Sequence, residues 1–371
     1  MKFLDEYRDA EKVKILVDQI HSIKLHPINI MEVCGSQTHT ILKYNLEELL
    51  PENINLIHGP GCPVCVTPIE MIDKAILLSQ HKDVIFTSYG DMLRIPGSGS
   101  SLLEARSNGA DVRMIYSPLD AVKLAKDNPL KKIIFFAIGF ETTAPANAAS
   151  VLAAKKLSLD NFFILSSHVL IPPAVKTLLN SELFRLNGLL APGHVCTITG
   201  TNWCEEISSR YNLPITITGF EPVDILDGIL LTSKQILLNE SKTLNQYKRV
   251  VTKGGNLKAQ EAIYNVFEVC NRKWRGLGEI KNSGLGITDE FSHFDAEKAF
   301  EINTVTSNED ERCIAGEILQ GLKKPNDCSL FGKDCTPTKP VGAPMVSSEG
   351  ACAAYYNYRS VLKTRNTDET D

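Results

Sequence analysis

The chain has 371 residues, of which 43% are hydrophobic and 22% charged, and its formal net charge is -5 at pH 7. This composition is typical of a soluble globular protein, and because Lys and Arg are dispersed, we expect neither a nucleic-acid nor a membrane partner. Residues 1–20 carry charges throughout and lack an apolar core followed by a small-residue cleavage site, so we expect a cytoplasmic protein.

Short apolar, β-rich runs recur along the first two thirds of the chain, each ending in a Gly, Ser or Thr cluster and each followed by a helical period. This βαβα order, with apolar strands, predicts parallel sheets that are covered on both faces. The predicted strands are residues 28–33, 54–59, 83–90, 112–117, 133–139, 162–167, 195–200 and 214–219.

The domain organisation is predicted from a short internal repeat and from a change in pattern after about residue 235, where helical periods and Gly-rich loops replace the apolar strands. Gly-Phe-Glu follows a predicted strand twice, at 139–141 and at 219–221, which indicates two related α/β halves. We predict two Rossmann-like α/β domains with parallel sheets and a third, mostly helical and loop-rich domain. The predicted ranges are 1–135, 136–235 and 236–371.

The first candidate site is the stretch "MEVCGSQTHT", which puts Cys34 at a strand end and at a helix start. Open α/β sheets bind ligands beyond the carboxyl ends of their strands, and the helix N-terminus is expected to lower the thiol pKa. Cys34 is therefore a candidate thiolate ligand or nucleophile, with Gln37 and His39 within one turn. A buried strand-end cysteine beside a surface histidine is equally consistent with the pattern.

The second candidate site is "GPGCPVC", in which Cys62 and Cys65 follow another predicted strand. In a cytoplasmic chain, ten cysteines are more typical of metal or redox sites than of structural disulfides. The CxxC spacing occurs in zinc knuckles and in redox dithiols, and a knuckle needs a second pair, which is absent nearby. The spacing therefore favours a redox dithiol, with two incidental cysteines in a turn as the alternative.

Weaker signals lie at other strand ends. Glu141 in "GFETTAP" starts a predicted helix, a capping and anion-binding geometry that needs no function at all, and we include it among the candidate site residues. The loop after Arg94, "IPGSGSS", is too short to be a nucleotide fingerprint. His168 and His194 lie at or near strand ends and fit either a cleft or a structural role.

Four cysteines near the C-terminus, Cys313, Cys328, Cys335 and Cys352, are separated by 14, 6 and 16 residues. Four thiols are the full complement of an iron–sulfur cluster or of a tetrahedral zinc ion. The segment around Cys335 is rich in Pro and Gly, and no CxxC pair is present, which favours an iron–sulfur cluster over zinc.

Four stretches together carry a family resemblance: "MEVCGSQTH", "GPGCPVCVTP", "GFETTAP" and "CSLFGKDCTPTKPVGAPMVSSEGACAAYY". They resemble the signature motifs of the HypD family of hydrogenase maturation proteins, in the same order and over about residues 28 to 358. The resemblance implies two α/β domains plus a third domain that holds a 4Fe-4S cluster. This chain departs from the family pattern three residues after Cys34, where it has Gln37 and many relatives have His. His39 is therefore the nearby imidazole.

The function that the resemblance implies is that of a cytoplasmic scaffold with redox activity, rather than a conventional turnover enzyme. On it the iron of nickel–iron hydrogenase acquires two cyanides and one carbon monoxide before delivery to the large subunit. Cys34 would hold this iron, Cys62 and Cys65 would form the dithiol beside it, and Cys313, Cys328, Cys335 and Cys352 would hold the 4Fe-4S cluster. The implied partners are HypC, which shares the iron through a cysteine, and HypE, which presents a thiocyanate.

Two alternatives come from other classes of protein. An iron–sulfur disulfide reductase of the ferredoxin–thioredoxin type has the same combination of cluster and CxxC pair, but it would have no use for Cys34 beside the dithiol. A structural zinc protein that bridges partners would be colourless, so metal analysis separates it from the iron–sulfur alternatives.

Overall fold

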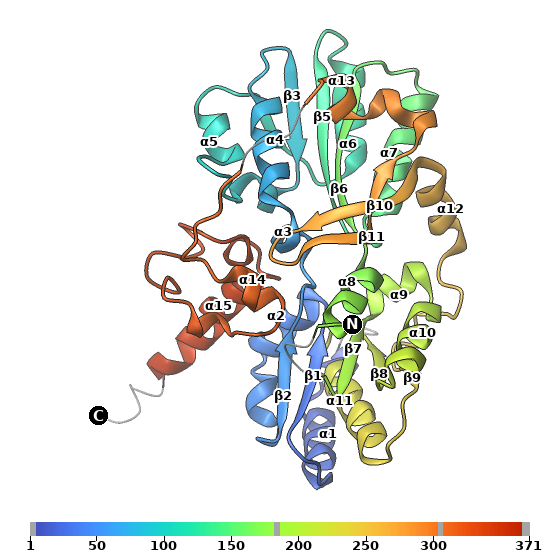
Figure 1. Ribbon diagram of the computed structural model, residues 1–371, viewed down its shortest axis with the longest axis vertical. Helices are drawn as coiled ribbons and strands as arrows, with labels where there is room; N and C mark the ends of the chain where they lie inside the picture. Colours follow the sequence, from blue (N-terminus) through green and yellow to red (C-terminus); the bar gives the residue numbers. More distant parts are fainter. Residues whose placement is uncertain (1–4, 182–185, 303–306, 366–371) are drawn as a thin grey trace.

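The computed structural model describes residues 5–181, 186–302 and 307–365. Its strands form two sheets, one in the lower and one in the upper part of Figure 1, with the C-terminal segment packed at the side. Parallel strands dominate both sheets, and this confirms the predicted α/β class with Rossmann-like parallel sheets.

The lower sheet is parallel throughout and has the strand order β2-β1-β7-β8-β9. Register pairing puts the last residue of β1, Glu32, opposite the last residue of β2, His58. The carboxyl ends of these two strands therefore lie side by side, and so do the loops that follow them. The strands are β1 Ile28–Glu32, β2 Ile54–His58, β7 Gly188–Pro192, β8 Ile215–Thr218 and β9 Thr243–Asn245.

The upper sheet has the order β10-β11-β6-β5-β3-β4, with an antiparallel hairpin added to a parallel core. The hairpin is the main departure from the predicted helical and loop-rich C-terminal region: the helical period after residue 256 ends where β10 begins. The strands are β3 Val84–Ser88, β4 Val112–Met114, β5 Lys132–Gly139, β6 Phe162–Val169, β10 Phe267–Trp274 and β11 Gly278–Ile287.

Some helices begin at a side-chain cap that the sequence supplies. Asp9 accepts hydrogen bonds from two N–H groups of the first turn of α1, and Ser117 forms a capping box with Asp120 at the start of α6. The α-helices are α1 Ala10–Ser22, α2 Gly35–Lys43, α3 Pro63–Val66, α4 Ile69–Ser79, α5 Leu102–Ser107, α6 Pro118–Asp127, α7 Ala144–Lys156, α8 Ile171–Leu179, α9 Gly193–Thr199, α10 Asn202–Tyr211, α11 Pro222–Leu237, α12 Leu257–Val266, α13 Ala296–Ala299, α14 Ala315–Leu319 and α15 Ala351–Arg365.

Short 3-10 turns complete the architecture. They are η1 Asp5–Tyr7, η2 Leu46–Leu49, η3 Gly90–Arg94, η4 Asp289–Phe294, η5 Pro325–Asp327 and η6 Ala343–Met345. The last of them contacts α3 and α15, so it joins the C-terminal segment to the centre of the molecule.

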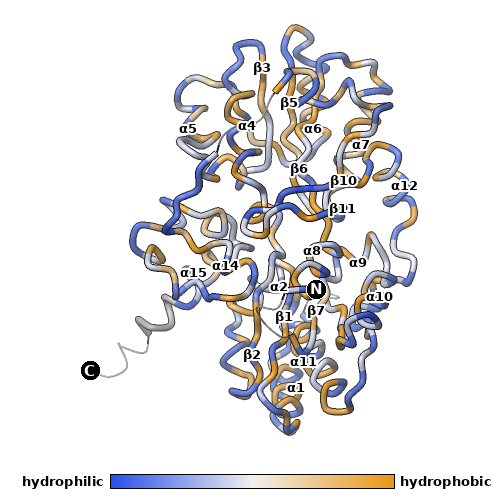
Figure 2. Tube along the Cα trace, in the orientation of Figure 1, coloured by the Kyte–Doolittle hydropathy of each residue, from blue (hydrophilic) through white to orange (hydrophobic). Residues whose placement is uncertain are grey.

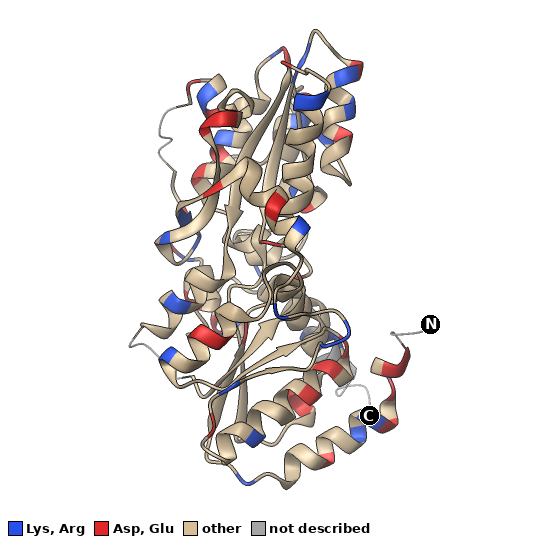
Figure 3. Ribbon diagram, turned by 90° about the vertical axis from the view of Figure 1, so that its right-hand side faces the viewer, with Lys and Arg blue, Asp and Glu red and all other residues tan. Residues whose placement is uncertain are grey.

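The central strands of each sheet are buried on both faces, as the apolar strands predict, whereas the β10–β11 hairpin leaves many residues exposed. In the lower sheet, Ile30 of β1 packs with α1 and α11 residues Ile20 and Ile229, whereas its neighbour Met31 belongs to the core cluster of the opposite face. Figure 2 shows hydrophobic residues along many of the strands, whereas β10 is largely hydrophilic. The positions of basic and acidic residues, coloured on the ribbon in Figure 3, are interspersed.

One predicted strand is wrong. Residues 195–200 lie in and just after α9, and the strand in this region is β7, directly before it. The β-branched and Thr-rich composition of this stretch predicted a strand. In the structure, the hydroxyls of Thr197 and Thr199 donate to the carbonyls four residues earlier, so both hydroxyls are hydrogen-bonded within the helix. Gly200, at a φ of 79°, ends the helix.

The sheets interleave along the chain. The lower sheet takes strands from 28–58 and 188–245, and the upper sheet takes strands from 84–169 and 267–287. The chain therefore crosses from one sheet to the other more than once. Within the described residues, no helix is long and apolar enough to cross a membrane.

Candidate functional site

The centre of the candidate site is formed by the loops that follow β1 and β2. Cys34 occupies the N-cap position of α2 without a side-chain cap, and Cys62 occupies that of α3, where its Sγ accepts the Cys65 N–H. The loops are in direct contact: the Gly35 N–H donates to the Gly61 carbonyl at 2.8 Å, and a Cβ on Gly61 would lie 2.1 Å from the Cys34 nitrogen. Only glycine at position 61 lets the two backbones come this close, so the turn of "GPGCPVC" places the CxxC segment in contact with the backbone of Cys34.

Cys62 and Cys65 are joined by a disulfide, with their Cα atoms 5.2 Å apart. Both are buried in the core cluster that also contains Phe140 after β5 and Ala343 of η6. Helix α3 contacts β5 and η6, so the pair lies where the lower sheet, the upper sheet and the C-terminal segment meet.

The thiol of Cys34 is fully buried, and its Sγ lies 3.7 Å from Nδ1 of His194. Burial raises the pKa of this thiol well above its usual value, and the negative charge of Glu32 adds to the rise. The prediction that the helix start lowers this pKa is therefore wrong. The N–H groups of Gln37 and Ser36 do act in that direction, but burial outweighs them.

His194 is the imidazole that the structure places beside Cys34. It lies in the first turn of α9, just past β7, and its ring stacks on Phe220 with centroids 5.0 Å apart. Burial lowers its pKa to about 4, so the ring is neutral at pH 7, the form that binds metals. The sequence suggested His194 only as one of two histidines near strand ends.

His39 and Gln37 point elsewhere. Nδ1 of His39 lies 3.2 Å from the Ser348 carbonyl and its Nε2 lies 3.4 Å from the Tyr358 hydroxyl, so the ring packs against the C-terminal segment. Gln37 is buried and donates to the Thr218 hydroxyl at 2.6 Å, which ties α2 to β8.

A buried polar network that the sequence analysis did not predict holds the backbone of Cys34. Glu32 accepts hydrogen bonds from the Cys34 N–H at 2.7 Å, from the Thr38 hydroxyl at 2.5 Å and from Nδ1 of His58 at 2.8 Å. The rings of His58 and Tyr355 meet edge to face, so the network reaches helix α15. A signal was present in the sequence, since Glu32 and His58 each end an apolar strand.

Glu141 lies at the carboxyl end of the upper sheet, two residues after β5. It is 4% exposed, and its Oε1 accepts the Ile171 N–H at 3.1 Å, while Oε2 has no hydrogen-bond partner among the described residues. Burial raises its pKa to about 7. Glu141 therefore fastens the start of α8 and does not cap α7, whose N-cap is Thr143.

His168 plays the structural role that its sequence context allowed. Its Nε2 pairs with the Asn147 amide at 2.6 Å and its Nδ1 pairs with the Ser166 hydroxyl at 3.2 Å. Burial lowers its pKa to about 3.

The four C-terminal cysteines line one small pocket together with residues of η6. Burial raises the pKa of Cys313 and Cys352, and the charges of the neighbouring cysteines add to the rise. A Cβ on Gly342 would lie 2.6 Å from Sγ of Cys313, and the Val341 N–H donates to Sγ of Cys335 at 3.3 Å. In the described part of the chain, no group of three or more His, Cys, Asp or Glu is arranged to hold a metal ion.

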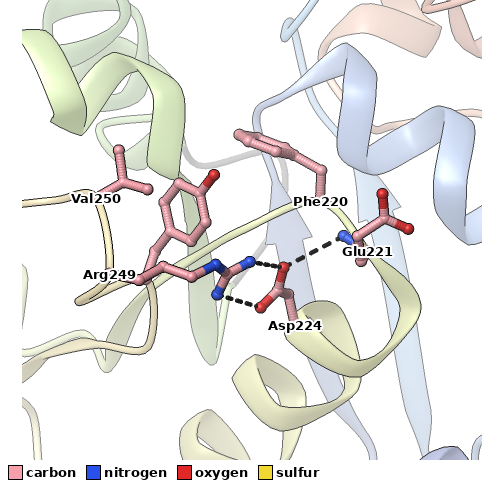
Figure 4. Close-up of a pocket in the computed structure, with 6 residues that line it drawn as sticks. Phe220, Glu221, Asp224, Arg249 and Val250 are labelled. Carbon is pink, nitrogen blue, oxygen red and sulfur yellow. Dashed lines mark hydrogen bonds and ion pairs between the residues drawn. The ribbon is translucent and has the colours of Figure 1, made fainter. Parts of the chain in front are cut away.

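A separate pocket of about 240 Å³ lies past Phe220, on the side of the lower sheet (Figure 4). Its wall includes a part-buried ion pair in which both terminal nitrogens of Arg249 bind Asp224, at 2.8 Å and 2.6 Å. Arg249 also lies over the rings of Tyr7 and Tyr247. Its cation is thus held by residues of the chain itself.

Comparison with known proteins gives consistent matches over nearly the whole chain. A family model for HypD, described as the hydrogenase formation hypA family, matches residues 11–359. The chain is 45% identical to the hydrogenase maturation factor HypD of Escherichia coli (strain K12), over 97% of this chain and 98% of that protein. It is 45% identical to HypD of Azotobacter vinelandii, over 96% and 97%, and 44% identical to HypD of Rhizobium leguminosarum bv. viciae, over 99% and 98%.

Proposed function

The chain belongs to the HypD family of hydrogenase maturation factors, and from this premise we propose that it is the scaffold on which the iron of nickel–iron hydrogenase acquires its cyanide and carbon monoxide ligands. The observation that carries the proposal is the contact between two loops: the CxxC segment, with its disulfide, is seated directly on the backbone of Cys34. A metal-binding thiol and a store of two electrons thus occupy one site.

In this proposal Cys34 binds the iron, which is the cargo of the reaction, and HypC contributes a second cysteine. A soft thiolate suits low-spin iron whose other positions are taken by strong-field diatomic ligands. His194, at 3.7 Å from the Cys34 sulfur, replaces His39 as the imidazole that ligates the iron or hydrogen-bonds its ligands. The raised pKa of Cys34 means that iron binding must displace the thiol proton.

We propose that the Cys62–Cys65 pair supplies the electrons that release cyanide from a thiocyanate on the HypE partner. Two thiolates of the pair become the disulfide, and the S–CN bond of the thiocyanate breaks to give cyanide and a thiolate on HypE, so that two electrons are balanced. Two electrons and two protons then restore the dithiol.

The four-cysteine pocket is the proposed site of a 4Fe-4S cluster, which when bound supplies electrons one at a time. The residues fit such a group. Four thiols surround one pocket, Gly342 leaves room for the Cys313 sulfur, and an N–H group already points at the Cys335 sulfur. The Pro- and Gly-rich segment around Cys335 and the lack of a CxxC pair among the four thiols favour a cluster over one zinc ion.

A single 3-10 turn, η6, connects the two redox sites. Pro344 and Met345 of η6 line the four-cysteine pocket, and the same turn contacts α3, which carries Cys65. The disulfide reductase alternative shares this path, but it leaves Cys34 and its contact with His194 without a role, and family membership does not favour it.

Infrared spectroscopy of the chain purified anaerobically with HypC tests the proposal. Native protein should show cyanide and carbonyl bands, and Cys34→Ala should remove them while its brown cluster absorbance persists, because the two sites lie on different elements. Cys270→Ala, at a half-buried position in β10, is the matched control and should keep the bands. Bands of native intensity in Cys34→Ala would show that the iron is held elsewhere.

A further inference from the structure

Two carboxylates lie beside the helix start that carries Cys34, and the proposed function gives their charge no role. The first is Glu32, which is 1% exposed. One of its oxygens accepts the Cys34 N–H at 2.7 Å, and the other accepts from the Thr38 hydroxyl and from Nδ1 of His58. A carboxyl group that accepts three hydrogen bonds and donates none is in its charged form. A buried anion is thus hydrogen-bonded to the residue whose sulfur is the proposed iron ligand.

The second carboxylate is Glu349, in the loop that leads into α15. The Ser36 hydroxyl donates to its Oε1 at 2.7 Å, and a Cβ on Gly35 would lie 2.6 Å from its Cβ. Glu349 therefore packs on the first turn of α2, directly after Cys34. In the part of the chain that the structure describes, no basic side chain forms an ion pair with Glu349.

The basic groups of the same network do not neutralise these carboxylates. Arg359 of α15 pairs with Glu47 of η2, and Glu47 also lies 3.6 Å from Nε2 of His58. Even with a proton on His58, the two cations of the network only equal its two anions, Glu32 and Glu47. The charge of Glu349 is then in excess, where α2 and α15 contact each other (Figure 1).

The charge of the iron changes while its ligands are added. Ferrous iron, the state that binds carbon monoxide, becomes neutral overall with two thiolate ligands, one from Cys34 and one from HypC. Each cyanide adds one negative charge and carbon monoxide adds none, so the finished group is a dianion. A fixed anion beside the site attracts the incoming cation and repels the finished group, and both effects are strong in a buried setting because little water screens them.

We propose that Glu32, assisted by Glu349, favours the capture of ferrous iron at Cys34 and disfavours retention of the finished group with its two cyanides. The inference rests on the proposed function, in which Cys34 binds the iron. Both oxygens of Glu32 are already occupied by hydrogen bonds, so Glu32 acts on the iron through space. It is a positioning residue and not a ligand.

Glu32→Gln tests the proposal, because it removes the charge and keeps the shape. The Thr38 hydroxyl and a ring nitrogen of His58 can each accept from the new amide instead of donating, so the hydrogen bonds are kept. In the chain purified anaerobically with HypC, competition with a chelator measures binding of isotopically labelled ferrous iron, which the label distinguishes from cluster iron. Glu32→Gln should bind this iron roughly tenfold more weakly than native.

The second measurement is retention of the finished group. Infrared spectroscopy of the complex, after incubation with the hydrogenase large subunit and separation from it, measures the cyanide bands that stay with the chain. Glu32→Gln should retain roughly threefold more of these bands than native, relative to the amount before transfer. The two effects have opposite signs, whereas a distorted site would weaken both iron binding and retention.

The matched control is Glu52→Gln, which removes the same charge from an exposed position just before β2, at the end of the strand away from the site. It should match native in both measurements, because solvent screens its charge. Weaker iron binding together with higher retention in Glu32→Gln supports the proposal, and any other combination overturns it.

Glu349→Gln covers the case in which Glu32→Gln does not fold. It should show the same pair of changes at a smaller size, and native behaviour in both measurements then overturns the inference. Failure of the proposed function has a different signature: a native complex that shows no cyanide bands, or bands that persist in Cys34→Ala, overturns the iron site itself and the inference with it.

Discussion

Replacing Glu141 by Gln should change how stability depends on pH. The carboxyl is 4% exposed, and one of its oxygens has no hydrogen-bond partner among the described residues, so the fold disfavours its charged form. Glu141→Gln keeps the acceptor for the Ile171 N–H and removes the titration. The cost of burying the amide is the same at every pH, so it cancels when the two proteins are compared across pH.

The magnitude follows from the pKa. Burial raises the pKa of Glu141 from 4.5 to about 7, which corresponds to about 3 kcal/mol at roughly 1.4 kcal/mol per pH unit. Between these values the folded chain binds more protons than the unfolded chain, so stability falls as pH rises. The contribution is fully present below about pH 4.5 and is lost above pH 7. Relative to Glu141→Gln, the native chain should therefore lose about 3 kcal/mol across this window.

Urea unfolding of both proteins at pH 5, 6, 7 and 8 measures this difference, with circular dichroism and fluorescence compared to check that one transition is observed. Titrations shared by both proteins, including that of buried His168, cancel. Glu104→Gln, at an exposed position, is the control and should track the native chain. A native-to-variant difference that stays constant within 1 kcal/mol from pH 5 to pH 8 would refute the reasoning.

Three further outcomes are expected. Cys352→Ala should bleach the brown absorbance and make the C-terminal segment more sensitive to proteolysis, and retention of four irons would contradict the cluster assignment. Thiol trapping with mass spectrometry should find Cys62 and Cys65 free after mild reduction and joined after mild oxidation, with cluster absorbance constant throughout; thiols that never pair would end the electron-store role. Asp224→Asn should lower the free energy of unfolding by about 2 kcal/mol, because it removes the charge of a buried carboxylate that pairs with the part-buried Arg249, and a loss below about 0.5 kcal/mol in urea unfolding would contradict this.

The parts of the fold that depend on local pattern were predictable from sequence. The apolar runs that became β1, β2 and β5 gave the class, and two of them placed Cys34 and the CxxC pair at strand ends. What the sequence could not show is strand order. His194 reaches Cys34 because β7, more than a hundred residues later, inserts beside β1, and no local signal encodes that pairing.

Two chemical predictions depended on knowing the surroundings. The pKa of Cys34 was predicted from the helix start alone, yet burial and Glu32 decide it, and burial is a property of the packed molecule. Similarly, His39 lies one turn from Cys34 in sequence, but Nδ1 of its ring lies 3.2 Å from the Ser348 carbonyl of the C-terminal segment. Proximity along a helix did not fix which way the ring points.

The interleaving of the two sheets has a consequence for how the protein is made. The chain leaves the lower sheet after β2, returns to it at β7 and leaves it again after β9. When the ribosome has released β1 and β2, the edge of β1 that β7 will cover is still open, and it stays open while the upper parallel strands β3 to β6 are synthesised. Unpaired strand edges invite association with other chains. The nascent protein therefore passes through a stage in which the half-built site that holds Cys34, Cys62 and Cys65 needs protection, and a fragment cut before residue 188 would keep that edge exposed.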